Sequence, residues 1–184
     1  MNADGSLADP HWNFIGRTCV PDAVPSVAKR PSMAMIIKAF HDTKFATATM
    51  GFQPKGNLTL VNLPNFYAAR WGAAGYGPGQ VDALDPATML GYQVQIRPKV
   101  ISYVYHYGDG EHSGPTDSPG GTYPEGDIRH TYRKVGQYTA QITLTWGADY
   151  RIDAGPWLAI PDQVSVNQPA TTIDVREAHN HLIP

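Results

Sequence analysis

The chain has 184 residues, of which 42% are hydrophobic and 16% charged, and it contains 18 Gly and 16 Pro. This is the size of one medium domain, and so much Gly and Pro favours short strands joined by turns over long helices. A formal net charge of −2 with no Lys/Arg runs gives no basic surface for nucleic acid, and the longest apolar runs are far too short to span a membrane.

The first 25 residues predict an irregular arm, because they carry three prolines among small and polar neighbours. Residues 1–10 lack the apolar stretch of a signal peptide, so we expect either a cytosolic protein or a sequence that begins after a removed signal. Cys19 is the only cysteine and therefore has no internal disulfide partner. We interpret it as an inert thiol, or as one whose partner lies in another segment or chain.

Residues 26–44 show the spacing of an amphipathic helix. Apolar residues recur at intervals of three, four and seven, so that most share one face. They are Val27, Met33, Ile36, Ile37 and Phe40. Pro31 is expected in the first turn, where its missing N–H costs least. We predict that residues 1–54 form an arm and helix packed on a β-sandwich of residues 55–184, with a partner-binding helix as the alternative.

Residues 51–56 contain Gly51, Pro54 and Gly56 and predict a break, after which strand patterns begin. Short strands are predicted at residues 58–62, 66–71 and 91–97. Residues 72–86 are rich in Gly, Pro and Asp and predict a long surface loop. Residues 150–152 and 158–160 predict a hairpin, with a turn at 153–156 and Trp157 at its base.

The strongest pattern lies between Ile101 and Trp146. Tyrosines at 103, 105 and 107 alternate with other residues and lead into Gly108-Asp109-Gly110, after which residues 111–129 are rich in turns. From Tyr138 to Trp146, apolar residues alternate strictly with Thr and Gln. This period of two, with Thr on the outer face, is typical of a half-buried antiparallel strand.

These pieces predict a corner followed by a strand. Gly108 and Gly110 allow a sharp turn, in which Asp109 accepts N–H bonds from the turn or from a facing loop. Gly136 breaks the chain before Tyr138, whose hydroxyl is placed to tie the corner, a device of immunoglobulin-like sandwiches. We expect His130 to donate a hydrogen bond to backbone within the same corner.

The order of these motifs resembles that of a PKD (polycystic-kidney-disease-repeat) domain. The matching elements are Tyr105-His106-Tyr107-Gly108-Asp109-Gly110, His130-Thr131-Tyr132 and Gly136-Gln137-Tyr138. The family usually has Trp where this chain has Tyr105, and the loop after Gly110 is long for the family. The resemblance implies an immunoglobulin-like antiparallel β-sandwich. Together with the arm and the helix predicted from the residues, the expected fold is a mostly β sandwich with an N-terminal arm and one short helix.

The wider layout resembles exported actinobacterial PKD-like proteins of unknown function. The shared elements are Arg17-Thr18-Cys19, the helix of residues 26–44 and Leu60-Val61-Asn62-Leu63-Pro64. This resemblance implies a secreted or cell-surface location and supplies no activity. A nucleotide ligand is not expected, because the chain has no Gly-x-x-x-x-Gly-Lys-Ser/Thr loop.

The sequence contains two sets of candidate metal ligands, but a structural role explains each set more simply, and we expect no cofactor. Oxygen ligands for Ca²⁺ would come from Asp109, Glu111, Asp117, Glu125 and Asp127, although their spacing fits no known calcium loop. Imidazole ligands for zinc would come from His106, His112, His130, His179 and His181. No serine lies in a Gly-x-Ser-x-Gly elbow, and no carboxylate pair has an apolar frame, so catalytic residues are not expected.

The aromatic residues divide into a core set and a surface set. The family pattern directs Tyr103, Tyr105, Tyr107, Tyr132, Tyr138 and Trp146 inward. The surface set comprises Tyr67, Trp71, Tyr76, Tyr123 and Trp157. Tyr76, Tyr123 and Trp157 are the candidate binding residues, because they lie in the Gly/Pro-rich loops 72–86, 111–127 and 153–157, and we expect at least one of them to be exposed and to anchor a partner.

The sequence thus favours a non-catalytic interaction or structural module of the cell envelope or exterior that binds protein or glycan. The alternative is a degenerate or metal-dependent hydrolase, which would need a polar pocket with a perturbed titratable group.

Overall fold

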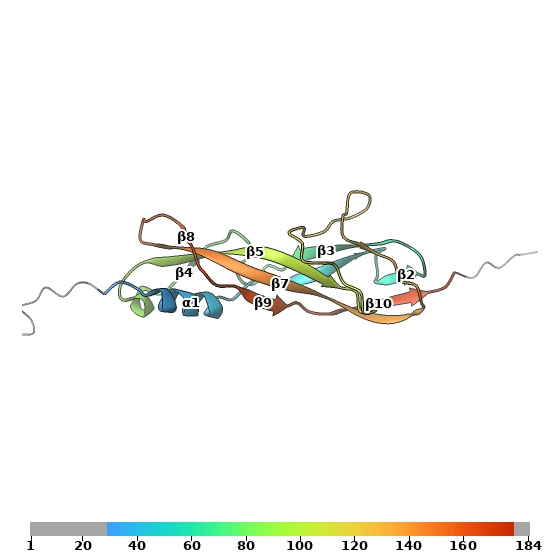
Figure 1. Ribbon diagram of the computed structural model, residues 1–184, viewed down its shortest axis with the longest axis horizontal. Helices are drawn as coiled ribbons and strands as arrows, with labels where there is room; N and C mark the ends of the chain where they lie inside the picture. Colours follow the sequence, from blue (N-terminus) through green and yellow to red (C-terminus); the bar gives the residue numbers. More distant parts are fainter. Residues whose placement is uncertain (1–28, 179–184) are drawn as a thin grey trace, which may run out of the picture.

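Two long antiparallel strands run through the whole molecule (Figure 1). The computed structural model describes residues 29–178. In it, β5 (Val94–His106) pairs with β7 (Gly136–Ile152) from Val94↔Ile152 to His106↔Gln141. Alternate side chains of both strands are buried, as the period-two pattern predicts.

The sequence predicted two strands where the structure has the single strand β5. Pro98 lies inside it, opposite Ala148. The carbonyl of Pro98 accepts a hydrogen bond from the N–H of Gly79, so the backbone groups of Pro98 point away from β7. The missing N–H of Pro98 therefore removes no hydrogen bond between β5 and β7. A register shift between Val100 and Ser102 then lets the strand continue.

The other strands form one large and one small sheet. In the large sheet, three strands pair with the edge of β7 that β5 leaves free: β10 (Thr171–Arg176), β9 (Val164–Asn167) and β8 (Leu158–Ala159). Strand β2 (Leu58–Leu60) pairs in parallel with β10, and β4 (Asp82–Ala83) pairs with β5. The small antiparallel sheet has the order β1 (Ala48–Gln53), β3 (Asn65–Trp71), β6 (Arg129–His130). The predicted hairpin is confirmed, because β8 pairs with the end of β7.

One α-helix is present in the described residues, and it is shorter than predicted. Helix α1 is Met33–Asp42, because the Ser32 side chain accepts a hydrogen bond from the N–H of Met35 and so caps the first turn. Pro31 therefore precedes the cap and does not occupy the first turn. Strand β4 lies within the predicted loop 72–86, and a short 3₁₀ helix, η2 (Pro86–Met89), begins at the last residue of that loop. Within residues 29–178, no helix has the length and apolar character needed to cross a membrane.

The inner face of the large sheet is covered by two different elements. Helix α1 lies below the end that carries β4 and β8, whereas β3 of the small sheet lies toward the other end (Figure 1). Phe40 and Phe45 connect the helix to Trp146 at the centre, where Phe45 stacks on the indole with the ring centroids 4.8 Å apart. The fold is therefore a mostly β sandwich with one short helix, as predicted.

Strand β1 lies in the segment for which the sequence predicted only an arm and helix. Its inward residues Ala48, Met50 and Phe52 do alternate with outward ones. The predicted break at Gly51 is wrong, because this residue lies within the β1–β3 pairing, opposite Ala68.

Gln168 joins the two sheets along one side of the sandwich. It is only 3% exposed, and its side-chain oxygen accepts a hydrogen bond of 2.7 Å from the N–H of Ala48 in β1. Its side-chain nitrogen donates to Val166, and its backbone bonds Ile142 and the side chain of Gln141. All the polar atoms of this buried side chain therefore have partners.

We expect Gln168→Leu to lower the free energy of unfolding by about 1–3 kcal/mol, because the buried N–H of Ala48 loses its acceptor while side-chain volume is kept. Denaturant unfolding would measure this. Gln163→Leu at an exposed position is the control. Equal stability of the two variants would contradict the bridging role of Gln168.

Candidate functional site

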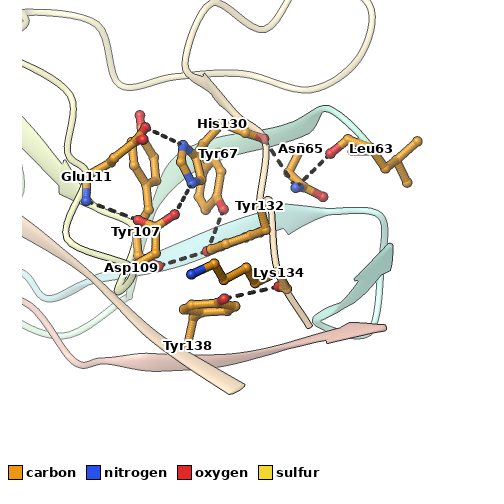
Figure 2. Close-up of polar contacts among 10 residues, drawn as sticks. All are labelled: Leu63, Asn65, Tyr67, Tyr107, Asp109, Glu111, His130, Tyr132, Lys134 and Tyr138. Atoms are coloured by element: carbon orange, nitrogen blue, oxygen red, sulfur yellow. Dashed lines mark hydrogen bonds and ion pairs between the residues drawn. The ribbon is translucent and has the colours of Figure 1, made fainter. Parts of the chain in front are cut away.

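The turn at the end of β5 brings Asp109 and His130 together (Figure 2). Gly108 has a φ of 89°, and a Cβ there would lie 2.6 Å from the carbonyl oxygen of Thr139, so only glycine fits. Asp109 Oδ1 accepts the N–H of Glu111 at 3.0 Å, closing the predicted turn, and Oδ2 lies 2.7 Å from His130 Nε2. The carboxylate therefore joins the 108–110 turn to strand β6.

The partner of the His130 ring differs from the prediction. We expected a backbone acceptor, but the ring meets the Asp109 carboxylate because β6 pairs with the start of β3 and faces the 108–110 turn. The His130 side chain is 6% exposed, stacked on Tyr107 with centroids 4.1 Å apart and edge-on to Tyr132. It is thus held on two sides by rings and on a third by a carboxylate.

Beside the histidine, the hydroxyls of Tyr67 and Tyr132 form a chain of buried hydrogen bonds (Figure 2). Tyr67 donates to the hydroxyl of Tyr132 at 3.0 Å, and Tyr132 donates to the carbonyl of Tyr107 at 2.8 Å. Burial raises the pKa of Tyr132 to about 12, and burial together with the bond to Tyr132 raises the pKa of Tyr67 further. Both phenols are therefore neutral over the physiological range.

The buried position of Tyr67 corrects the prediction that it belongs to the surface. Tyr67 shares the inward face of β3 with Asn65, which is also fully buried. Asn65 accepts from Thr59 and donates to the carbonyls of Leu63 and His130. Sequence analysis missed Asn65, although its spacing of two from Tyr67 placed both on one face. Trp71, also predicted at the surface, is half-buried and lies edge-on to Trp146.

The prediction for Tyr138 is confirmed. Its hydroxyl donates to the carbonyl of Lys134, four residues earlier, at 3.0 Å, and its ring stacks on Tyr132. The bond ties the start of β7 to the segment before it, as the sequence predicted.

This geometry favours a structural role for the Asp109–His130 pair. A catalytic histidine oriented by a carboxylate must direct its other nitrogen at a nucleophile. Here His130 Nδ1 faces Glu111, with 3.6 Å between the nitrogen and Oε2. Both ring nitrogens thus face carboxylates, and neither is directed at a hydroxyl or thiol.

The structure brings together three candidate metal ligands, Asp109, Glu111 and His130, and places His106 beside His112, but the other described candidates lie apart from these groups. In the part of the chain that the structure describes, no three His, Cys, Asp or Glu side chains form a group that could hold a metal ion. His106 bonds Thr143 and His112 bonds the carbonyl of Ser113. The remaining acidic candidates, Asp117, Glu125 and Asp127, are exposed. Cys19, His179 and His181 lie outside the described residues.

The loop between β5 and β6 closes the second side of the sandwich. Its first part pairs with β5, through reciprocal bonds between Tyr103 and Thr116. Its middle part pairs with β3, where Gly120 approaches the backbone of Tyr67 so closely that a Cβ would not fit. Residues 111–121 therefore contribute to the fold, and Tyr123 lies at the exposed tip of the loop. The loop rises above the sheets in Figure 1.

Tyr123 is 71% exposed at that tip, which fits its predicted role as an anchor. Its N–H donates to the side chain of Gln53 at 2.8 Å, and its ring packs edge-on against Phe66. Arg129 donates to the carbonyls of Pro124 and Gly126. The side chain is thus presented on a loop that is held on both sides.

A groove of about 280 Å³ lies beside this ring, and we refer to it as the Tyr123 groove. Its lining residues are Gln53, Pro54, Lys55, Leu63, Pro64, Phe66 and Tyr123. Sequence analysis missed all of them except Tyr123. No sequence signal joins them, because they come from three separate segments.

Trp157 is placed differently. The guanidinium carbons of Arg97 and Arg151 lie 4.4 and 4.8 Å from its ring centroid. Burial acts to raise the pKa of the neighbouring Asp149, but hydrogen bonds from Lys99 and Arg97 outweigh it and hold that pKa below its usual value. Trp157 is therefore already engaged within the chain, on the outer face of the large sheet.

Tyr76 is half-buried, and its backbone bonds that of Lys44 and Ala46. A hydrogen bond to Asp82 raises the pKa of its hydroxyl. None of the contacts among the described residues joins any two of Tyr76, Tyr123 and Trp157. They belong to three regions, and Tyr123 is the exposed one.

A scan of protein-family models found no match to this chain, and a search of the curated proteins found none either.

Replacing Asp109 by Ala should lower the free energy of unfolding by about 1–3 kcal/mol, because the buried His130 ring and the Glu111 N–H lose their acceptor. Thermal and denaturant melts would show this. Asp109→Asn keeps an oxygen for Glu111 and should cost less, and Asp117→Ala is the exposed control. An Asp109→Ala melt as stable as the control would disprove the structural role.

The buried phenols predict alkaline unfolding. Their pKa values are raised from 10.0 in the folded state, so the stability they contribute is complete below about pH 10 and declines as the pH rises through about 12 for Tyr132. Denaturant unfolding at stepped pH, together with phenolate absorbance, measures this. Tyr67→Phe removes one titrating group and should make the decline shallower. A decline that stays equally steep would show that other groups control it.

Proposed function

We propose that this chain is a non-catalytic, PKD-like interaction module of the cell envelope or exterior, and that it binds a protein partner at the Tyr123 groove. The observation that carries the proposal is the exposed ring of Tyr123 on a loop fixed by Gln53 and Arg129. Aromatic side chains dominate interface energetics, and a loop ordered in advance loses little entropy on binding.

The lining of the groove favours a protein over a glycan. Beside Tyr123 it presents Pro54, Leu63, Pro64 and Phe66, which are apolar. A sugar would need several polar groups for its hydroxyls as well as an aromatic platform. Only two of the seven lining residues, Gln53 and Lys55, have polar side chains besides the Tyr123 hydroxyl, and the side-chain oxygen of Gln53 is already bonded to the N–H of Tyr123. Apolar side chains of a protein partner suit this surface better.

The location and family are supported by sequence. The Gly108-Asp109-Gly110, His130 and Tyr138 motifs resemble those of PKD domains, and the wider layout resembles exported actinobacterial proteins. The non-catalytic role is supported by the engagement of Asp109 and His130 with each other and with Glu111.

Tyr123→Ala should reduce capture of the native partner by about tenfold or more while leaving the melting temperature unchanged, as truncation of an interface anchor does. The measurement is capture by the tagged full chain from envelope, medium and cytosolic fractions. A photo-cross-linking residue at position 123 would identify the protein in contact.

Leu158→Ala is the matched control, because Leu158 is a 50% exposed apolar residue remote from the groove. Capture that is equal for the Tyr123 and Leu158 variants would refute the site. Capture confined to the cytosolic fraction would refute the location.

A further inference from the structure

A second groove lies between α1 and the segment that contains β4 and η2, and it is larger than the Tyr123 groove, at about 570 Å³. We refer to it as the α1–η2 groove. Its lining residues are Met35, Lys38, Ala39, Asp42, Thr43, Asp82, Leu84, Asp85, Thr88 and Met89. It belongs to the Val94 end of β5, whereas Tyr123 lies near the other end of the ladder.

The floor of this groove is apolar. Met89 is buried, and Met35, Ala39 and Leu84 are half-buried, whereas most of the polar lining residues are exposed. Helix α1 buries Ile36 and Phe40 against the core. Met35 and Ala39 lie on the adjoining stripe, facing space that η2 leaves unfilled.

The rim of the groove is acidic. Three carboxylates, of Asp42, Asp82 and Asp85, accompany one ammonium group, that of Lys38. Lys38 pairs with Asp42 at 2.6 Å, and Asp85 caps η2 through the N–H of Ala87. Asp82 has a long contact of 3.4 Å with the hydroxyl of Thr43. Two negative charges therefore remain in excess around an apolar floor.

We propose that the α1–η2 groove docks a basic amphipathic helix of a partner protein. The apolar floor would take the apolar stripe of that helix, and the carboxylates would meet flanking Lys or Arg side chains. The lining comes largely from α1 and η2, so affinity depends on side chains and not on pairing with a strand edge. The same carboxylates repel nucleic acid and anionic membrane surfaces.

This proposal is independent of the Tyr123 groove, since it concerns another surface with a different charge. The probe is a synthetic peptide with Leu on one helical face and Lys on the other, added to the full chain. Its counterpart with Glu in place of every Lys tests the role of charge. The methyl groups of Met35 and Met89 report binding by NMR, and Met50, buried in the sandwich, is the internal control.

The Lys peptide should shift the methyl signals of Met35 and Met89 but not that of Met50, and the Glu peptide should shift none. Asp42→Asn combined with Asp82→Asn should weaken binding by about fivefold, and added salt should weaken binding to the unmodified chain more than to this variant. Glu125→Gln, which removes a charge at the far tip, should leave binding unchanged.

Two blocking variants complete the test. Ala39→Arg fills the floor, and Thr88→Arg places a cation on the exposed rim, where the substitution removes only the exposed bond from the Thr88 hydroxyl to the carbonyl of Asp85. Each should weaken binding of the Lys peptide by about tenfold or more. Binding that survives in a folded Thr88→Arg variant would overturn the proposal. The absence of any shift at Met35 and Met89 on addition of the Lys peptide would also overturn the proposal. This holds whether the groove is closed, is filled by residues 1–28 or is covered by a second copy of the chain.

Discussion

The pairing of β5 with β7 is the constraint on which the rest of the molecule depends. These strands have 13 and 17 residues, whereas those of the small sheet have seven or fewer. At about 3.4 Å per residue, the small sheet covers roughly half of the inner face of β5, and a helix must cover the remainder. The α1–η2 groove is a consequence of this arrangement. Helix α1 and the short 3₁₀ helix η2 cover the second half of the inner face of β5 less completely than a sheet would.

The corner at the far end of this ladder determines how Tyr123 is presented. Asp109 bonds His130, and the hydroxyls of Tyr67 and Tyr132 bond each other and the carbonyl of Tyr107. The His130 ring packs against the rings of Tyr107 and Tyr132, so the two sets of bonds together fix the end of β5 against the small sheet. The loop that leaves this corner then pairs with both sheets before it reaches Tyr123. A carboxylate–histidine pair that superficially resembles a catalytic one thus supports a rigid surface loop.

The two grooves offer different chemistry at opposite ends of one scaffold. The Tyr123 groove presents an exposed ring and prolines, and the α1–η2 groove combines an apolar floor with excess carboxylates. A module with both surfaces would contact two partners, or two parts of one, without overlap. Trp157 contributes to neither, because Arg97 and Arg151 cover it.

The sequence by itself determined the features that depend on neighbours a few residues apart. These are the period-two strands, the Asp109 turn and the bond from Tyr138 to Lys134. Tertiary structure alone decided that Tyr67 is buried, that His130 meets Asp109 and that Gln168 bonds Ala48. Each of these depends on which distant segments lie side by side, and no local pattern of residues carries that information.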